Sequence, residues 1–296
     1  MWPFSKKRTI AQSGILAGCT DHHSHILPGV DDGVESMDEA LRILATYEAA
    51  GVKELWLTPH IMEDIPNTPD KLRARFAELT AQYKGSITLH LAAEYMIDNH
   101  LRSLLMNCHS VTNNCPSFER GTSNAGSIAE GVKETNTKLR PASEGRWHEQ
   151  SEVTEGSNHP QGKGVSLLPI GTKGNHLLVE TSYFNPPMRL HETLRQIKSL
   201  GYHPLLAHPE RYMYMDEEEY IRLHQEGVKF QLNLPSICGG YGNTVKKRAQ
   251  WLLKKGLYDV IGSDTHCEEG VEYLLGSRHK QKDLRALQTL LSQTLR

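Results

Sequence analysis

The segment Asp21-His22-His23-Ser24-His25 ends an apolar run and carries three histidines within four positions. Residues two apart in a strand face the same side, so His23 and His25 can converge on one ion while His22 faces away. Ligand-type residues at strand ends are typical of a barrel with a metal centre at its open end. Five more motifs follow apolar runs in this way: Thr58-Pro59-His60, Ala93-Glu94-Tyr95, Val179-Glu180-Thr181, Ala207-His208-Pro209-Glu210-Arg211 and Gly262-Ser263-Asp264-Thr265-His266.

Strand-like runs alternate with helix-like segments, which predicts parallel β/α units and an α/β fold. One helix start has Ser36 as N-cap with Glu39 three residues on, and another has Thr68 before Pro69. The predicted strands lie near 15–21, 54–58, 87–93, 176–181, 203–207, 228–234 and 258–263. The predicted helices cover 36–50, a segment opening at 68, 188–200, 216–226, 244–255 and a terminal segment from 280.

Residues 107–164 break this alternation. The segment is rich in Ser, Thr, Asn, Gly, Glu and Lys, and it is far longer than the usual connection of about 4–6 residues. We predict a disordered polar insertion within a single domain that spans residues 1–296. Because the segment falls between two motif-bearing strands, the barrel can accommodate it as a long loop at its edge.

Composition excludes several classes of partner. The 33 basic and 35 acidic residues give a formal charge of −2, so no global field favours nucleic acid or an anionic membrane. The five cysteines are odd in number and scattered, which favours a reducing compartment, and we predict a cytoplasmic protein. No stretch before Asp21 has the length of a signal-peptide apolar region, so no membrane insertion is predicted.

The donor set indicates the chemistry. Glu94 and Glu180 end apolar strands, where an unpaired carboxylate is costly to desolvate, so each requires a cation. Asp264 and His266 repeat the two-residue spacing of the first motif. Imidazoles and carboxylates without an obvious thiolate favour Mn²⁺, Fe or Zn²⁺ over Ca²⁺ or a structural zinc. Several carboxylates imply more than one ion, which is typical of phosphoryl hydrolysis.

Other motif residues have two interpretations from the residues alone. His60 and His208 adjoin prolines, so each is either a turn histidine or a ligand at a strand exit. Asp31-Asp32-Gly33 favours a turn, yet its place beyond the histidine pair makes one of the two aspartates a candidate ligand. Arg211 is either a bidentate phosphate partner or one half of a surface salt bridge.

At these motifs the chain resembles the polymerase-and-histidinol-phosphatase (PHP) metal-dependent phosphoesterases. Within them it is similar to the bacterial protein-tyrosine phosphatases of capsule and exopolysaccharide operons. The resemblance covers residues 15–106 and 165–270. It rests on Asp21-His22-His23-Ser24-His25-Ile26-Leu27-Pro28-Gly29-Val30-Asp31-Asp32-Gly33, Thr58-Pro59-His60, Ala207-His208-Pro209-Glu210-Arg211-Tyr212 and Gly262-Ser263-Asp264-Thr265-His266.

The resemblance implies a distorted (β/α)7 barrel, a three-metal site occupied by Mn²⁺, with Fe or Zn²⁺ as alternatives, and a phosphate-binding role for Arg211. It also implies a phosphotyrosyl substrate, typically the tail of a tyrosine autokinase that controls polysaccharide export. The implied ligands are His23, His25, Glu94 and Asp264 for the first metal, Glu94, Glu180 and His208 for the second, and Asp32, His60 and His266 for the third. The implied catalytic residues are Arg211, Glu94 and His208.

Two departures from the family pattern leave alternatives open. Some relatives carry a second arginine after the last motif, where this chain has Glu268 and Glu269, and Arg278 is only a loose substitute. The insertion at 107–164 is also foreign to the pattern. The alternatives are a hydrolase of small phosphomonoesters such as histidinol phosphate, and a non-catalytic module that docks on a kinase or an assembly factor. A cysteine phosphatase is excluded because no cysteine begins a Cys-x5-Arg sequence.

Overall fold

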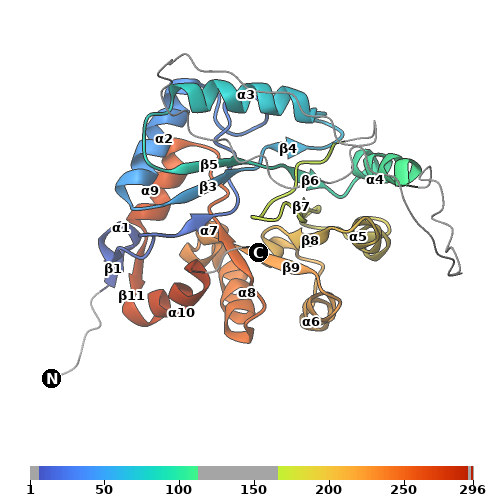
Figure 1. Ribbon diagram of the computed structural model, residues 1–296. Helices are drawn as coiled ribbons and strands as arrows, with labels where there is room; N and C mark the ends of the chain where they lie inside the picture. Colours follow the sequence, from blue (N-terminus) through green and yellow to red (C-terminus); the bar gives the residue numbers. More distant parts are fainter. Residues whose placement is uncertain (1–6, 113–165, 293–294, 296) are drawn as a thin grey trace, which may run out of the picture.

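Strands line the centre of the molecule and helices surround them (Figure 1). A computed structural model describes residues 7–112, 166–292 and 295. The central strands are β2 (Thr20–Asp21), β3 (Glu54–Leu57), β4 (His60–Ile61), β5 (Thr88–Leu91), β6 (Glu94–Met96), β7 (His176–Glu180), β8 (His203–Leu206), β9 (Lys229–Asn233) and β10 (Val260–Gly262). The helices around them are α2 (Met37–Ala49), α3 (Pro69–Gln82), α4 (Asn99–Thr112), α5 (Leu190–Ser199), α6 (Glu217–Gln225), α8 (Gly242–Lys255), α9 (Glu268–Gly276) and α10 (Gln281–Leu291).

The strands form two parallel sheets, ordered β2-β3-β5 and β10-β9-β8-β7-β6-β4. The chain of β3 continues into β4 after two residues, and that of β5 continues into β6, so the two sheets share two strand lines. A parallel bridge between Ser24 and Thr265, with the His22 N–H donating to the Ile261 carbonyl at 3.1 Å, joins the line of β2 to that of β10. The predicted distorted (β/α)7 barrel is therefore confirmed.

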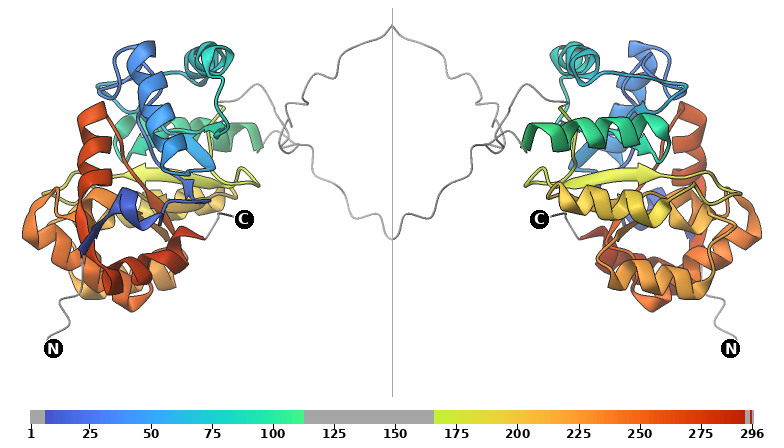
Figure 2. Two further views of the ribbon diagram at one scale, coloured as in Figure 1. Left: turned by 90° about the vertical axis from the view of Figure 1, so that its left-hand side faces the viewer. Right: turned by 90° about the vertical axis from the view of Figure 1, so that its right-hand side faces the viewer.

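The capping signals are also confirmed. Ser36 Oγ accepts the N–H of Glu39 at 3.2 Å, and Thr68 Oγ1 accepts that of Lys71 at 3.3 Å. Each bond satisfies one of the N–H groups that a first helical turn leaves without a partner. The six predicted helices begin within two residues of their expected positions. The helices cover the outside of the sheet (Figure 2).

The structure corrects two boundaries. The strand expected over 15–21 begins only at Thr20, because residues 14–18 form turns in which Gly14 and Gly18 have positive φ angles. The polar segment expected from 107 begins inside α4, which continues to Thr112. The remainder of that predicted insertion lies outside the described residues. Elements that the sequence patterns did not indicate include β1 (Lys7–Thr9), α1 (Ile10–Ser13), α4, α7 (Leu234–Cys238), α9 and β11 (Arg278–Lys280), which pairs antiparallel with β1.

Two apolar clusters form the core, one on each side of the sheet. The inner cluster fills the barrel with Trp56, Leu178, Leu205 and Val260, and Leu295 belongs to it. The outer cluster packs the other face of the strands against the helices. Because strand residues alternate, Glu180 shares the inner face with Leu178 and lies at the carboxyl end of β7. Within the described residues, no helix combines the length and apolarity needed to cross a membrane.

Candidate metal centre

The carboxyl ends of the strands bring all nine predicted ligands into one cluster. Within each of four overlapping groups, one potential ligand atom per residue lies within 4.8 Å of the others. The groups are His25, Asp32, His60 and His266; His23, His208 and Asp264; His23, His25 and Glu94; and His60, Glu94 and Glu180. Motifs up to 243 positions apart in the sequence thus meet at one end of the barrel.

Glu94 lies at the centre of this cluster and is fully buried. Its Oε2 lies 3.1 Å from His23 Nε2 and 3.2 Å from His25 Nε2. The same oxygen lies 3.4 Å from His60 Nδ1, whereas Oε1 lies 3.3 Å from His208 Nε2. A carboxylate whose two oxygens face different imidazoles is suited to bridge two ions.

Glu180 faces the same point from β7. Its Oε1 lies 3.3 Å from His60 Nδ1 and its Oε2 lies 3.7 Å from His208 Nε2. Burial raises the pKa of Glu180 well above its usual value, and the charges of Glu94 and Asp264 raise it further. Bringing all these carboxylates to the ionised state therefore requires additional positive charge.

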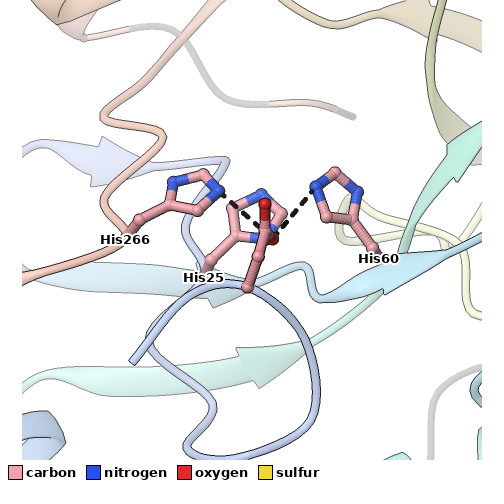
Figure 3. Close-up of side chains that lie close together, drawn as sticks. His25, His60 and His266 are labelled. Atoms are coloured by element: carbon pink, nitrogen blue, oxygen red, sulfur yellow. Dashed lines mark ion pairs between the residues drawn. The ribbon is translucent and has the colours of Figure 1, made fainter. Parts of the chain in front are cut away.

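A third group lies at the outer edge of the cluster. Asp32, whose side chain is 62% exposed, places Oδ1 3.5 Å from His60 Nε2 and 3.7 Å from His266 Nε2. Figure 3 shows the rings of His25, His60 and His266 close together. The ring of His25 has its centroid 4.4 Å from that of His60 and 4.1 Å from that of His266. This group is the most open part of the cluster.

The geometry distinguishes Asp31 from Asp32. Asp31 Oδ2 lies 2.8 Å from His25 Nδ1 and accepts the backbone N–H of His60 at 3.0 Å. Its Oδ1 accepts the N–H of Gly33 at 3.1 Å. Asp31 thus orients His25 from behind and leaves Asp32 as the candidate ligand. A hydrogen-bonded carboxylate of this kind fixes the ring and tautomer of a metal-binding histidine.

Two more histidines are oriented in the same way. His23 Nδ1 lies 2.9 Å from Gln231 Oε1, and His266 Nδ1 lies 2.9 Å from the Asp264 carbonyl oxygen. In each ring an Nδ1–H donor leaves the Nε2 lone pair facing the cluster. The strand β10 approaches closely enough that a Cβ at Gly262 would lie 2.5 Å from His23 Cβ. Gln231 was not among the predicted site residues, because an amide inside the apolar run 228–234 gives no ligand signal.

Two candidate ligands have strained backbones. His208 has φ 31° and Asp264 has φ 53°, and both follow the ends of inner strands. Residues other than glycine rarely adopt such left-handed angles, and those that do are concentrated at functional sites. The left-handed backbone at each position directs the side chain toward the other candidate ligands.

Two acidic motif residues lie outside the cluster and support the structure around it. Asp21 Oδ1 accepts the N–H groups of His23 and Ser263 at 3.2 and 2.9 Å. Glu210 is fully buried, accepts the Asn233 N–H at 3.0 Å and contacts the Tyr258 hydroxyl at 2.8 Å. Asp21 thus links the first motif to the segment after β10, and Glu210 links its motif to the end of β9.

Arg211 closes one side of the cluster. It ends the short 3₁₀ helix η1 (Pro209–Arg211), and its Nη1 donates to Asp264 Oδ2 at 3.1 Å. The side chain is 17% exposed and lines the same cavity as seven of the nine candidate ligands. Arg278, the loose substitute for a second arginine, lies on β11 and is not among the residues that line this cavity.

The residues fit a set of divalent cations. Burial opposes the charged form of Glu94, but charge and hydrogen bonds from His23 and neighbouring histidines hold its pKa well below the usual value. Glu94 Oε1 and His60 Nδ1 are buried and have no hydrogen-bond partner among the described residues. Unpartnered buried polar atoms are costly, and ions placed between these donors would satisfy them.

The cavity above the cluster has a volume of about 800 Å³. Besides the ligand-type residues and Arg211, it is lined by Tyr183, Phe184, Tyr241 and Tyr273. These aromatic residues were not predicted from the sequence. The site therefore combines a charged floor with an aromatic wall.

Comparison with known proteins identifies the family. The model of the family described as "Capsular polysaccharide synthesis, CpsB/CapC" matches residues 19–118 and 160–273. The chain belongs to this family. The two matched segments contain every candidate ligand and Arg211.

Relatives in the CpsB/CapC family match the chain over most of its length. CapC of Staphylococcus aureus is 22% identical over 268 residues, covering 90% of this chain and 84% of CapC. The tyrosine-protein phosphatase CpsB of Streptococcus pneumoniae is 24% identical over 253 residues, covering 83% and 82%. A crystal structure from a study of YwqE of Bacillus subtilis and CpsB, described as metal-dependent tyrosine phosphatases, superposes with a TM-score of 0.61. That match, at 18% identity, covers 94% of this chain and 96% of the other, and it supports the fold.

Proposed function

We propose that this chain is a metal-dependent protein-tyrosine phosphatase that hydrolyses phosphotyrosine. The observation that carries the proposal is the convergence of nine imidazole and carboxylate side chains, seven of which line one cavity together with Arg211. Its CpsB/CapC relatives, among them a tyrosine-protein phosphatase of Streptococcus pneumoniae, support the same reaction.

The proposed ligands keep the assignment that the family resemblance implies. His23, His25, Glu94 and Asp264 hold the first ion, Glu94, Glu180 and His208 the second, and Asp32, His60 and His266 the third. Bound divalent cations would supply an activated water and neutralise charge on the phosphoryl group. Asp31 and Gln231 hold the imidazoles of His25 and His23 in the orientation that binding needs.

Arg211 is proposed to bind the phosphoryl oxygens. Among the described residues, Asp264 is the only acceptor hydrogen-bonded to its side chain, at 3.1 Å, so other guanidinium N–H groups remain for a ligand. A planar guanidinium binds two phosphoryl oxygens at once and keeps its charge at any physiological pH. Arg211 therefore orients the ester and stabilises the charge that develops during hydrolysis.

We assign Mn²⁺ as the metal, with Fe and Zn²⁺ as alternatives, because the donors are imidazoles and carboxylates. The proposed substrate is the phosphorylated tail of a bacterial tyrosine autokinase in capsule or exopolysaccharide synthesis. The family description, which refers to capsular polysaccharide synthesis, supports this setting. A cytoplasmic location is proposed from the odd number of dispersed cysteines.

A hydrolase of small phosphomonoesters would use the same ligands. The aromatic residues Tyr183, Phe184 and Tyr241 on the cavity wall favour an aryl ester over an alkyl one. A non-catalytic docking module is the remaining alternative, and it predicts a folded protein without turnover.

The test compares initial rates of phosphate release from a phosphotyrosyl peptide and from histidinol phosphate, with Mn²⁺ or with EDTA. We expect Mn²⁺-dependent turnover that favours the peptide and falls at least about 1000-fold in His23→Ala. His100→Ala, on α4, is the matched histidine control. Equal or greater activity on histidinol phosphate would contradict the assigned substrate, and folded protein without turnover would contradict the assigned reaction.

A further inference from the structure

The guanidinium of Arg211 contacts two tyrosine rings that contribute to the cavity wall. Its Cζ is 4.1 Å from the ring centroid of Tyr183 and 4.2 Å from that of Tyr241. The two rings come from different parts of the fold, since Tyr183 follows β7 and Tyr241 precedes α8. We propose that Tyr183 and Tyr241 are positioning residues that clamp Arg211 in the orientation needed to bind a phosphoryl group.

The first ring is itself held in place. Tyr183 stacks on the fully buried Tyr212 with ring centroids 6.3 Å apart and an interplanar angle of 20°. The Tyr183 carbonyl accepts the N–H of Met213 at 2.7 Å, and the Tyr212 hydroxyl donates to the Ala207 carbonyl at 2.8 Å. Tyr183 therefore extends a packed aromatic layer rather than moving with a free loop.

The second ring is presented by a glycine-rich corner between α7 and α8. Gly239 and Gly242 on either side of Tyr241 have φ angles of 97° and 84°, which residues with a Cβ rarely adopt. The Tyr241 hydroxyl lies 3.5 Å from Asn233 Nδ2, and that amide also donates to Asp264 Oδ2 at 2.8 Å. The corner thus connects the clamp to the carboxylate that pairs with Arg211.

The clamp leaves Arg211 few ways to move. Both rings contact the guanidinium at close range, and Asp264 accepts a hydrogen bond from its Nη1. An unrestrained arginine must lose considerable rotamer freedom when it binds a ligand, and cation–π contacts fix it beforehand. Since Asp264 Oδ1 also lies 3.5 Å from His23 Nε2, the same carboxylate sets the position of Arg211 relative to the candidate metal ligands.

The test begins with a direct measurement of the arginine. Relaxation of the side-chain ¹⁵Nε of Arg211, assigned from the spectrum of Arg211→Lys, reports its motion without any need for turnover. We expect a rigid signal in the wild type and in Tyr241→Phe, with an order parameter near 0.8 or above, and a mobile one below about 0.6 in Tyr241→Leu and Tyr183→Leu. Tyr273→Leu is the matched control, because it removes another cavity tyrosine with no ring contact to Arg211. An unchanged Arg211 order parameter in both leucine variants, with native amide spectra, overturns the clamp.

The consequence for catalysis rests on the proposed phosphatase function. We expect Tyr241→Leu to lower kcat/KM by about tenfold, mainly through KM, and Tyr241→Phe to stay within about twofold of wild type. In an Arg211→Ala background, Tyr241→Leu should cause less than a further twofold loss, because the residue it positions is gone. Additive losses would contradict the positioning role. Wild-type protein without turnover would contradict the phosphatase function instead, while the relaxation data would still decide whether the clamp exists.

Discussion

The two ends of the barrel interior are built from the same strands. The carboxyl end gathers charged side chains, whereas the amino end buries a neutral imidazole. Along β7 the inner face carries His176, Leu178 and Glu180 at two-residue intervals. At the carboxyl end, Glu180 lies within 4 Å of His60 and His208, and it shares with Glu94 a group of potential ligand atoms that lie within 4.8 Å of one another. At the amino end, His176 is buried, and its Nδ1 has no hydrogen-bond partner among the described residues.

The difference shows how one interior separates function from stability. The carboxylates at the mouth repel one another unless cations enter, so that end is held ready for metal at a cost in stability. The imidazole at the base is accommodated as a neutral group beside apolar residues. We therefore expect bound metal ions to stabilise the mouth, which is the carboxyl end, and a neutral His176 to stabilise the base, which is the amino end.

The largest expected effect separates activity from stability at Glu180. Glu180→Gln should lower kcat/KM by at least about 100-fold, because a proposed metal ligand is lost. In metal-free protein the same change should raise Tm by a few degrees, because a buried carboxyl beside Glu94 and Asp264 no longer has to ionise. Thermal scans with and without Mn²⁺ would measure this, with the exposed Glu35→Gln as control.

The pH dependence at Glu180 has a definite sign. Its folded-state pKa lies well above the ordinary value of 4.5, so the folded protein binds more protons than the unfolded chain over that interval. The contribution of Glu180 to the stability of metal-free protein should therefore fall as pH rises above about 4.5, so wild type should lose more stability over that rise, or gain less, than Glu180→Gln. A steeper loss in the variant would contradict the proposed electrostatic cause.

A smaller effect is expected at the base. Leu295 is 6% exposed within the inner cluster, and its carbonyl accepts the Thr172 N–H and hydroxyl at 3.3 and 3.1 Å. Leu295→Ala should cost about 2 kcal/mol of unfolding free energy and lower Tm by about 5 °C. If the base only supports the barrel, kcat/KM should stay within about twofold of wild type. A large loss of activity at temperatures where the variant is folded would break the separation between the two ends.

Local signals accounted for much of the fold and for the candidate ligands. Ser36 and Thr68 were identified as caps because such caps depend on a few neighbouring residues. The two-residue spacing of His23 and His25 indicated convergence because strand geometry has a fixed period. Their assignment to particular metals remains a prediction.

The remaining site residues depend on tertiary contacts that leave no local signal. Tyr183 and Tyr241 meet at Arg211 although neither is near it in the sequence. In the sequence Gln231 is one more residue of a buried strand. Only the structure places its Oε1 beside His23. The helix α9 was missed although Glu268 and Glu269 in its first turn and the buried pair Val271 and Leu274 provided a signal.

The smallest expected effect concerns His176. Burial, with the charges of His203 and Lys229, lowers its pKa to about 4. Between pH 4 and 6.5 the unfolded chain therefore binds more protons at this residue than the folded protein does, so its contribution to stability is lost as pH falls through that range. His176→Phe removes the titrating group and should reduce the drop in Tm between pH 7 and pH 4.5 by one or two degrees.

The imidazole Nδ1 of His176 has no hydrogen-bond partner among the described residues, so its replacement removes no side-chain bond at that atom. Thermal scans in EDTA would compare wild type, His176→Phe and the α4 variant His100→Phe, so that metal loss at the mouth cannot mimic proton uptake at the base. Equal acid-induced shifts in wild type and His176→Phe would mean that the base does not sense protons through this residue. A smaller shift in His176→Phe alone would place part of the acid sensitivity at the end of the barrel opposite the metal ligands.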